Sequence, residues 1–284
     1  MYMMLQFVLC SLLIVALFAF PTASHLGAEQ GLAIFLDILL PYVLPYLLLT
    51  NWLFALLQRI VVSKRTAFTV SYLTSAIGGY PVGAIACLSL YKQQLITKRQ
   101  ASLLLPFLHS PNPFFIINYI GGDLLQNVHF SVTYLLLHHV LSISAVIYIY
   151  KQTTKDEHQI AYTPTSFQTI IEQTISTALT IAVTIIFFSS FTYICVELFS
   201  TTLPIATNAL LIGALELTNG TQFAAQYLSG QLLIVYFAFL LSSQSISIHV
   251  QVAAVTYGYF SLRPYVIIRL LFTLLLTASF LLYN

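Results

Sequence analysis

One apolar stretch, Ala67 to Leu124, constrains the fold most, because it is hydrophobic enough for a membrane but is broken twice. The first break is the run GGYPVGA, in which Gly79 frees the backbone and Pro81 suits the first turn of a new helix. Each arm beside this break has about eleven to fourteen residues, whereas a spanning helix needs about twenty. The sequence therefore predicts a re-entrant helical hairpin with both ends on one side of the membrane.

The second break in this stretch is HSPNPFF, from His109 to Phe115. Non-helical backbone at membrane depth is tolerated only where protein buries it or where it lines a cavity. Discontinuous helices of this kind form the solute sites of many transporters. Two breaks so close together predict a solute site between them.

Composition places the chain in a membrane, since 59% of its 284 residues are hydrophobic and 6% are charged. The apolar runs are long and continuous, whereas the strands of a membrane barrel alternate over about ten residues. The predicted fold class is an all-α integral membrane protein. The lengths of the apolar segments predict about seven transmembrane helices plus two re-entrant helical hairpins in an inverted repeat.

The breaks recur in the same order in two halves, at an offset of about 132 to 137 residues. Each half has a span, a hairpin, a broken span and a final span, and this odd number of crossings inverts the second half. In that half the hairpin is broken at LELTNG and the span at SSQSISIH. The predicted organisation is an N-terminal transmembrane helix and outer loop over 1–30, a first repeat over 31–150, a cytoplasmic linker over 151–165 and a second repeat over 166–284.

Basic residues sort to one side of this topology. Cytoplasmic loops are enriched in Lys and Arg, so we expect a cytoplasmic N-terminus and an external C-terminus. The residues assigned to the cytoplasmic side are Arg59, Lys64, Arg65, Lys92, Lys98, Arg99, Lys151, Lys155 and Arg263. The expected outer loops carry Glu29, Asp123 and Glu197, and Arg269, within the last span, can snorkel to the surface. The first segment lacks the basic start of a cleaved signal peptide, which favours a retained span.

Four half-helices are predicted to begin near the membrane midplane, beside the four breaks. The first N–H groups of a helix lack partners and carry a partial positive charge, so converging helix starts suit an anion. Ser110, Asn112 and Asn219 lie at these starts. They either donate hydrogen bonds to a solute or only cap the helices.

Glu216 is the sharpest single candidate, because a carboxylate inside a membrane segment is costly and is a functional candidate by default. We expect it to bind a coupling ion or a proton. The alternative is a structural pair with His109 or His249. These two histidines flank the broken spans, and each either contacts a solute or proton or serves in packing.

Enzymatic functions lack their reactive residues here. The chain contains no HExxH, GxSxG, CxxC or GxxxxGK[ST] motif, so we expect neither an enzyme nor a cofactor or metal site. The expected partners are a small-molecule anion, a coupling cation or proton, and the lipid bilayer. Nucleic acid is not expected, and a homo-oligomer stays open.

The runs SAIGGYPVGA, LITKRQASLLLPFLHSPNPFFIINYIGG, LELTNG and SISIHVQV, in this order, resemble the YlbJ-type sporulation integral membrane proteins, which carry the nucleoside-recognition or gate domain. The resemblance covers most of the chain from Gly31 onward. It implies a transporter-like protein of endospore-forming bacteria, in the cell membrane or a forespore-related membrane, associated with moving dipicolinate into the spore. By position it points to Gly79, Tyr80, Pro81, Ser110, Asn112, Pro113, Glu216, Asn219, Gly220, His249 and Gln251.

The leading hypothesis is a secondary transporter or permease for a small organic anion, with dipicolinate first. The anion would bind between the hairpin tips, with Glu216, His249 and His109 available to a coupling ion or proton. Ile85 stands where many family members carry a lysine, which keeps another solute, such as a nucleoside, open. A passive channel and a non-transporting sporulation membrane scaffold are the rival functions.

Overall fold

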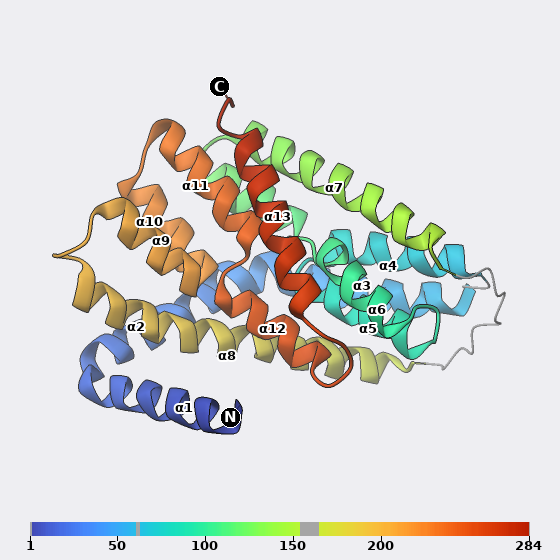
Figure 1. The fold of residues 1–284 in the computed structure, drawn as a ribbon, viewed down its shortest axis with the longest axis horizontal. Helices are drawn as coiled ribbons and strands as arrows, with labels where there is room; N and C mark the ends of the chain where they lie inside the picture. Colours follow the sequence, from blue (N-terminus) through green and yellow to red (C-terminus); the bar gives the residue numbers. More distant parts are fainter. Residues whose placement is uncertain (1, 61–62, 154–164, 284) are drawn as a thin grey trace.

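The computed structural model describes residues 2–60, 63–153 and 165–283, and within these ranges every regular element is helical (Figure 1). Four helical segments are long and apolar enough to cross a membrane: Pro21–Leu57, Val128–Lys151, Phe167–Phe199 and Gly230–Thr256. The chain thus has the all-α membrane fold that its composition predicts.

The elements of the first half are α1 (Tyr2–Ala19), α2 (Pro21–Ala33), the π-helical η1 (Ile34–Leu39), α3 (Leu40–Ile60), α4 (Lys64–Gly78), α5 (Val82–Lys92), α6 (Lys98–Leu108), the π-helical η2 (Phe115–Leu124) and α7 (Val128–Lys151). Those of the second half are α8 (Phe167–Phe199), α9 (Ile205–Leu215), α10 (Leu217–Tyr227), α11 (Gly230–Ser243), α12 (Ile246–Thr256) and α13 (Arg263–Ser279). Most of the predicted cytoplasmic linker, at 154–164, lies outside the described residues.

The start of the chain corrects one prediction, because the outer loop expected up to residue 30 is the helix α2. α2 packs along α8 with a face of small residues, Ala23, Gly27 and Gly31. The two backbones are so close that a Cβ on Gly31 would lie 2.8 Å from Ile186 Cα. Small residues let membrane helices approach in this way, so α2 follows α8 instead of turning away as a loop.

Two helical hairpins, α4–α5 and α9–α10, occupy corresponding places in the two halves. The turn of the first lies at Gly79, which has φ 73° and ψ −158°, a backbone region essentially restricted to glycine. Ser63 caps the start of α4, and its side chain accepts a hydrogen bond from Thr66 N. The second hairpin has a tighter turn, where Glu216 alone separates the two helices.

Each hairpin is followed by an interrupted helix. α6 ends at Leu108, residues 109–112 are non-helical, and helix then resumes into η2. In the second half, α11 ends at Ser243 and α12 begins at Ile246. The helix breaks thus fall at HSPNP and SSQS, as the sequence predicts.

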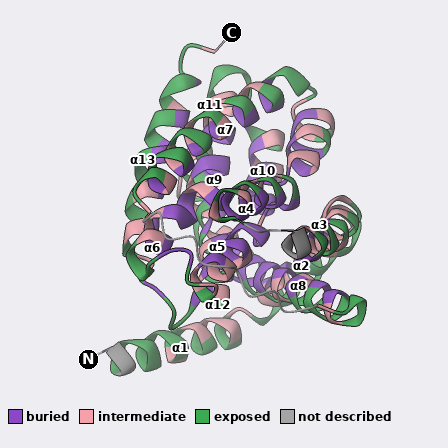
Figure 2. Cartoon of the chain, turned by 90° about the vertical axis from the view of Figure 1, so that its right-hand side faces the viewer, coloured by how far each residue is buried: buried purple, intermediate pink, exposed green. Residues whose placement is uncertain are grey.

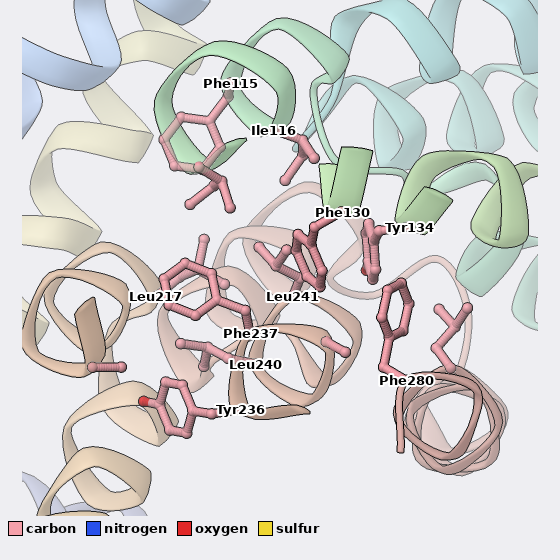
Figure 3. Packing of buried hydrophobic residues seen from close by; sticks show 14 of the residues in the cluster. Phe115, Ile116, Phe130, Tyr134, Leu217, Tyr236, Phe237, Leu240, Leu241 and Phe280 are labelled. Atoms are coloured by element: carbon pink, nitrogen blue, oxygen red, sulfur yellow. The ribbon is translucent and has the colours of Figure 1, made fainter. Parts of the chain in front are cut away.

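An aromatic core joins the second hairpin to the end of the first half (Figure 3). Phe130 of α7 lies near Phe280, with ring centroids 4.9 Å apart, and its ring meets that of Phe237 edge-on. On the other side of this core, the Tyr236 hydroxyl donates a 2.6 Å hydrogen bond to Ala209 O. These contacts fix α11 against α7 and α9.

Buried residues face the interior of the helix assembly, and exposed residues cover its outward faces (Figure 2). Many of the exposed side chains are large and apolar, including Leu270, Leu271, Leu274 and Leu275 of α13. Such a surface suits lipid as the surrounding solvent.

The ends of α3, α5 and α7 and the starts of α4, α6 and α8 gather at the right-hand end of the molecule in Figure 1. Basic residues concentrate at these helix ends: Lys64, Arg65, Lys92, Lys98, Arg99 and Lys151. The connections α1–α2, α8–α9 and α10–α11 lie toward the opposite end. Positive charge is therefore polarised along the length of the molecule.

Candidate solute site

The turns of both hairpins border one central cavity with a volume of about 60 Å³. Four polar residues identified in the sequence line it: Tyr80, Asn112, Glu216 and Gln251. Apart from Thr218, the rest of its lining is apolar: Leu39, Val43, Phe115, Ile116, Ile181, Ile185, Leu217, Leu241 and Ile248. A largely apolar cavity with a few convergent polar groups is the usual form of a small-molecule site.

Asn112 holds the first break against the first hairpin. Its Nδ2 donates to the carbonyl oxygens of Ile77 and Gly78, at 3.3 and 3.5 Å, where α4 ends. Its Oδ1 accepts from the N–H groups of Phe114 and Phe115, at 2.9 and 3.1 Å, where helix resumes. The capping role left open by the sequence is therefore real, and it occupies both ends of this amide.

Glu216 is buried at the turn of the second hairpin and caps the start of α10. Its Oε2 accepts from Asn219 N at 2.8 Å and from Asn219 Nδ2 at 3.2 Å. Asn219 Nδ2 also donates to Ser189 Oγ at 2.6 Å, which ties the turn to α8. The alternative pair with His109 or His249 is not formed within the described residues, because the carboxylate binds the helix start beside it.

Gln251 links the cavity to α8 through Gln251 Nε2, which donates to Thr184 Oγ1 at 2.9 Å. Thr184 continues a polar row on α8 with Gln173, Thr177 and Thr180, spaced by four, three and four residues and therefore on one helix face. Those three residues line a second, larger cleft of about 670 Å³, bordered also by Pro81. The cleft and the central cavity thus adjoin at the Tyr80–Pro81 turn.

A cluster of polar side chains centres on Gln244, at the second break. Gln244 Oε1 accepts from His109 Nδ1 and from the Tyr265 hydroxyl, each at 3.0 Å. Gln244 Nε2 donates to the Tyr80 hydroxyl at 2.9 Å and to His109 O at 3.1 Å. His249 Nδ1 lies 3.1 Å from the Tyr265 hydroxyl. These five residues, the Gln244 cluster, join the two breaks to the first hairpin.

Arg269 reaches the same cluster, which corrects a second prediction. It does not snorkel to the surface but is 1% exposed, with Nη2 donating to His109 O at 2.8 Å and to Pro106 O. These carbonyls lie at the end of α6, where intrahelical donors are missing and the helix dipole is negative. A cation on α13 therefore caps the broken helix of the first half.

Ser110 and His138 form a further buried contact, with Ser110 Oγ 3.3 Å from His138 Nε2. His138 comes from α7 and is fully buried, while its neighbour His139 lies near the Tyr72 hydroxyl instead. The two adjacent histidines thus point to different surroundings, as their 100° separation on a helix requires.

The remaining sequence candidates shape the backbone around the cavity and do not line it. A Cβ on Gly79 would lie 2.6 Å from Asn112 Cβ, so the first hairpin touches the break at this glycine. Pro113 begins the helix after the break, and Gly220 lies in the first turn of α10. His109 and His249 lie in the Gln244 cluster, which reaches the cavity through Tyr80.

Sequence reasoning missed Gln244 and the inward position of Arg269. Gln244 could have been identified from its position in the SSQS break, but the flanking serines are the more evident candidates there. For Arg269 the signal was a single cation in an otherwise apolar helix, which is a functional candidate unless it reaches the surface.

No protein-family model matches this chain, and neither a curated protein nor a solved structure does. Any function must therefore be argued from the structure itself. It has a central cavity lined by the buried carboxylate of Glu216, and it holds a second buried charge, the guanidinium of Arg269.

Proposed function

We propose that the protein is a secondary transporter or permease for a small organic anion, with dipicolinate as the first candidate and a nucleoside-like solute as the second. The observation that carries the proposal is the central cavity, to which both halves of the chain contribute polar residues at helix turns and breaks. Transporters built from repeats bind solutes at such sites, between discontinuous helices. Dipicolinate itself comes from the resemblance to the YlbJ-type proteins.

The proposal includes a topology of about seven spans and two re-entrant hairpins, in two inverted halves. It places the protein in a bacterial cell membrane, with the N-terminus in the cytoplasm and the C-terminus outside. The gathering of Lys and Arg at one end of the molecule supports this orientation, because basic residues favour the cytoplasmic side.

Glu216 is assigned to the coupling cation or proton. It is the carboxylic acid in the cavity lining, and it lies at the turn of the second hairpin. An ionised carboxylate there would repel an organic anion, whereas a bound cation or proton would remove the repulsion. Binding of the cation or proton to Glu216 therefore favours binding of the anion, and the reverse. Symport requires this coupling between the two binding events.

The larger cleft beside α8 supplies access from the end that carries the basic residues. Its polar lining leads toward Thr184, which contacts Gln251 in the central cavity. Rocking of one half against the other would close this cleft and open the cavity to the opposite side.

The test is uptake of labelled dipicolinate into proteoliposomes under imposed sodium, proton or electrical gradients. We expect saturable uptake by the unmodified chain and its loss on Glu216→Gln, which removes the ionisable group. Glu197→Gln is the matched control, since Glu197 is exposed at the far end of α8. Its uptake should equal that of the unmodified chain.

The remaining outcomes separate the rival functions. Saturable uptake of nucleosides and not of dipicolinate would show that the transported solute is a nucleoside. Flux that never saturates and follows only the solute gradient would indicate a passive channel. Well-folded protein without flux of either solute under all three gradients would contradict transport and favour the scaffold.

A further inference from the structure

Arg269 is a buried cation without a carboxylate partner. Among the described residues, no carboxylate lies within 4 Å of the Arg269 guanidinium. Arg269 lies instead between aromatic rings, with Cζ 5.3 Å from the ring centroid of Phe272 and 6.0 Å from that of Tyr265. Burying an unpaired charge is strongly unfavourable, so its environment has to supply compensation.

The α6 carbonyls compensate this charge only in part. Nη2 donates to the carbonyls of Pro106 and His109, but Nε and Nη1 of Arg269 are buried and have no hydrogen-bond partner in the described structure. Buried polar groups are normally satisfied, and a guanidinium has donors for more than one anionic oxygen. Two donor nitrogens of the guanidinium thus remain without a hydrogen bond within the described structure.

A short chain of hydrogen bonds connects Arg269 with the central cavity. Arg269 and Gln244 donate to the same acceptor, His109 O, at 2.8 and 3.1 Å. Gln244 also donates to the hydroxyl of Tyr80, and Tyr80 lines the cavity. Arg269 is therefore connected through His109 and Gln244 to Tyr80 in the cavity lining. It is buried in a low-dielectric interior, where its charge is weakly screened.

We propose that Arg269 is the fixed positive charge that makes the central cavity selective for solutes bearing a carboxylate. This inference rests on the proposed function, because it names the chemical class of solute for the same cavity. The carboxylate of a solute in the cavity offsets the guanidinium charge across Tyr80, because Arg269 lies near the cavity without lining it. Arg269 is then the counterpart of Glu216, which has the opposite charge and itself lines the cavity.

The experiment compares two ligands of one shape, dipicolinate and its uncharged analogue pyridine-2,6-dimethanol, for binding to purified full-length protein in detergent. We expect the unmodified chain to bind dipicolinate more tightly. Arg269→Gln should weaken dipicolinate binding at least about 30-fold, as for loss of one partner of a buried charged contact, and should leave the uncharged ligand within a few-fold. Arg263→Gln, on the exposed first turn of the same helix, should change neither.

Arg269→Lys keeps the proposal testable if Arg269→Gln does not fold. Because lysine retains the charge, this variant should still prefer dipicolinate. Equal affinity of the unmodified chain for both ligands would overturn the inference, and so would loss of the preference in Arg269→Lys or its survival in Arg269→Gln. Failure of the inference is distinct from failure of transport, since uptake of the uncharged ligand that Glu216→Gln abolishes would leave a transporter without anion selectivity.

Discussion

Glu216 and Arg269, two buried residues of opposite charge, obey one rule. Glu216 caps the start of α10, and Arg269 binds the carbonyls that end α6. Anions are stabilised at helix starts and cations at helix ends. Each residue is thus held at a half-helix terminus of opposite polarity, which allows a membrane protein to keep both charges without pairing them.

The capping role of Glu216 can be separated from its charge. Glu216→Gln keeps an amide oxygen that can accept from Asn219 N, so we expect the thermal midpoint in detergent to change little. Glu216→Leu leaves that N–H unsatisfied and should cost about 1 kcal/mol or more, as for loss of an N-cap. The midpoint should fall in the order unmodified, Gln, Leu. Equal midpoints for Gln and Leu would show that the cap contributes nothing.

At the scale of elements, the first hairpin and the first break act as one unit. Gly79 lies against Asn112, and Asn112 bonds both the end of α4 and the start of the next helix. A displacement of the hairpin would therefore move the break with it. The geometry of Tyr80 in the cavity wall depends on this contact.

Gly79→Ala should destabilise this unit. The Gly79 backbone conformation alone costs a residue with a side chain about 1 to 3 kcal/mol, and the new Cβ would collide with Asn112. Gly258→Ala is the matched control, because Gly258 has φ 78° but no atom within 4 Å of an added Cβ. We expect a larger fall in thermal midpoint for Gly79→Ala, together with loss of uptake. An equal fall for both variants would contradict close packing at the turn.

The hairpin turns and helix breaks could be predicted because their cause is local. Glycine and proline at 78–81 end one helix and begin another, whatever surrounds them. The roles of Gln244 and Arg269 could not be predicted, because their partner His109 lies more than a hundred residues away. The helical start at 21–30 was missed for a similar reason, since packing on α8 stabilises it.

The whole molecule is organised around contacts between its halves. The break residue His109 bonds Gln244, 135 positions later, and Gln244 also bonds Tyr80 of the first hairpin and Tyr265 of the last helix. This separation matches the offset at which the sequence repeats its breaks. Two interrupted helices meeting at equivalent points are what a pair of inverted repeats would produce.

Inversion is tested by labelling from outside the cell. Lys98 and Glu197 are exposed, at the start of α6 and the end of α8. If the broken span, α7 and α8 each cross once, the chain crosses three times between these two positions, and they lie on opposite sides. Single-cysteine variants at Lys98 and Glu197 are placed in a chain whose own cysteines are replaced by serine. An impermeant maleimide then reports which of the two is external.

We expect Glu197→Cys to react in intact cells and Lys98→Cys to react only after the membrane is permeabilised, because the basic residues at 98 and 99 favour the cytoplasm. The chain without cysteines measures background labelling. Reaction of both variants from outside would mean an even number of crossings between them. The halves would then share one orientation, and the two hairpins could not enter the membrane from opposite sides to meet at one cavity.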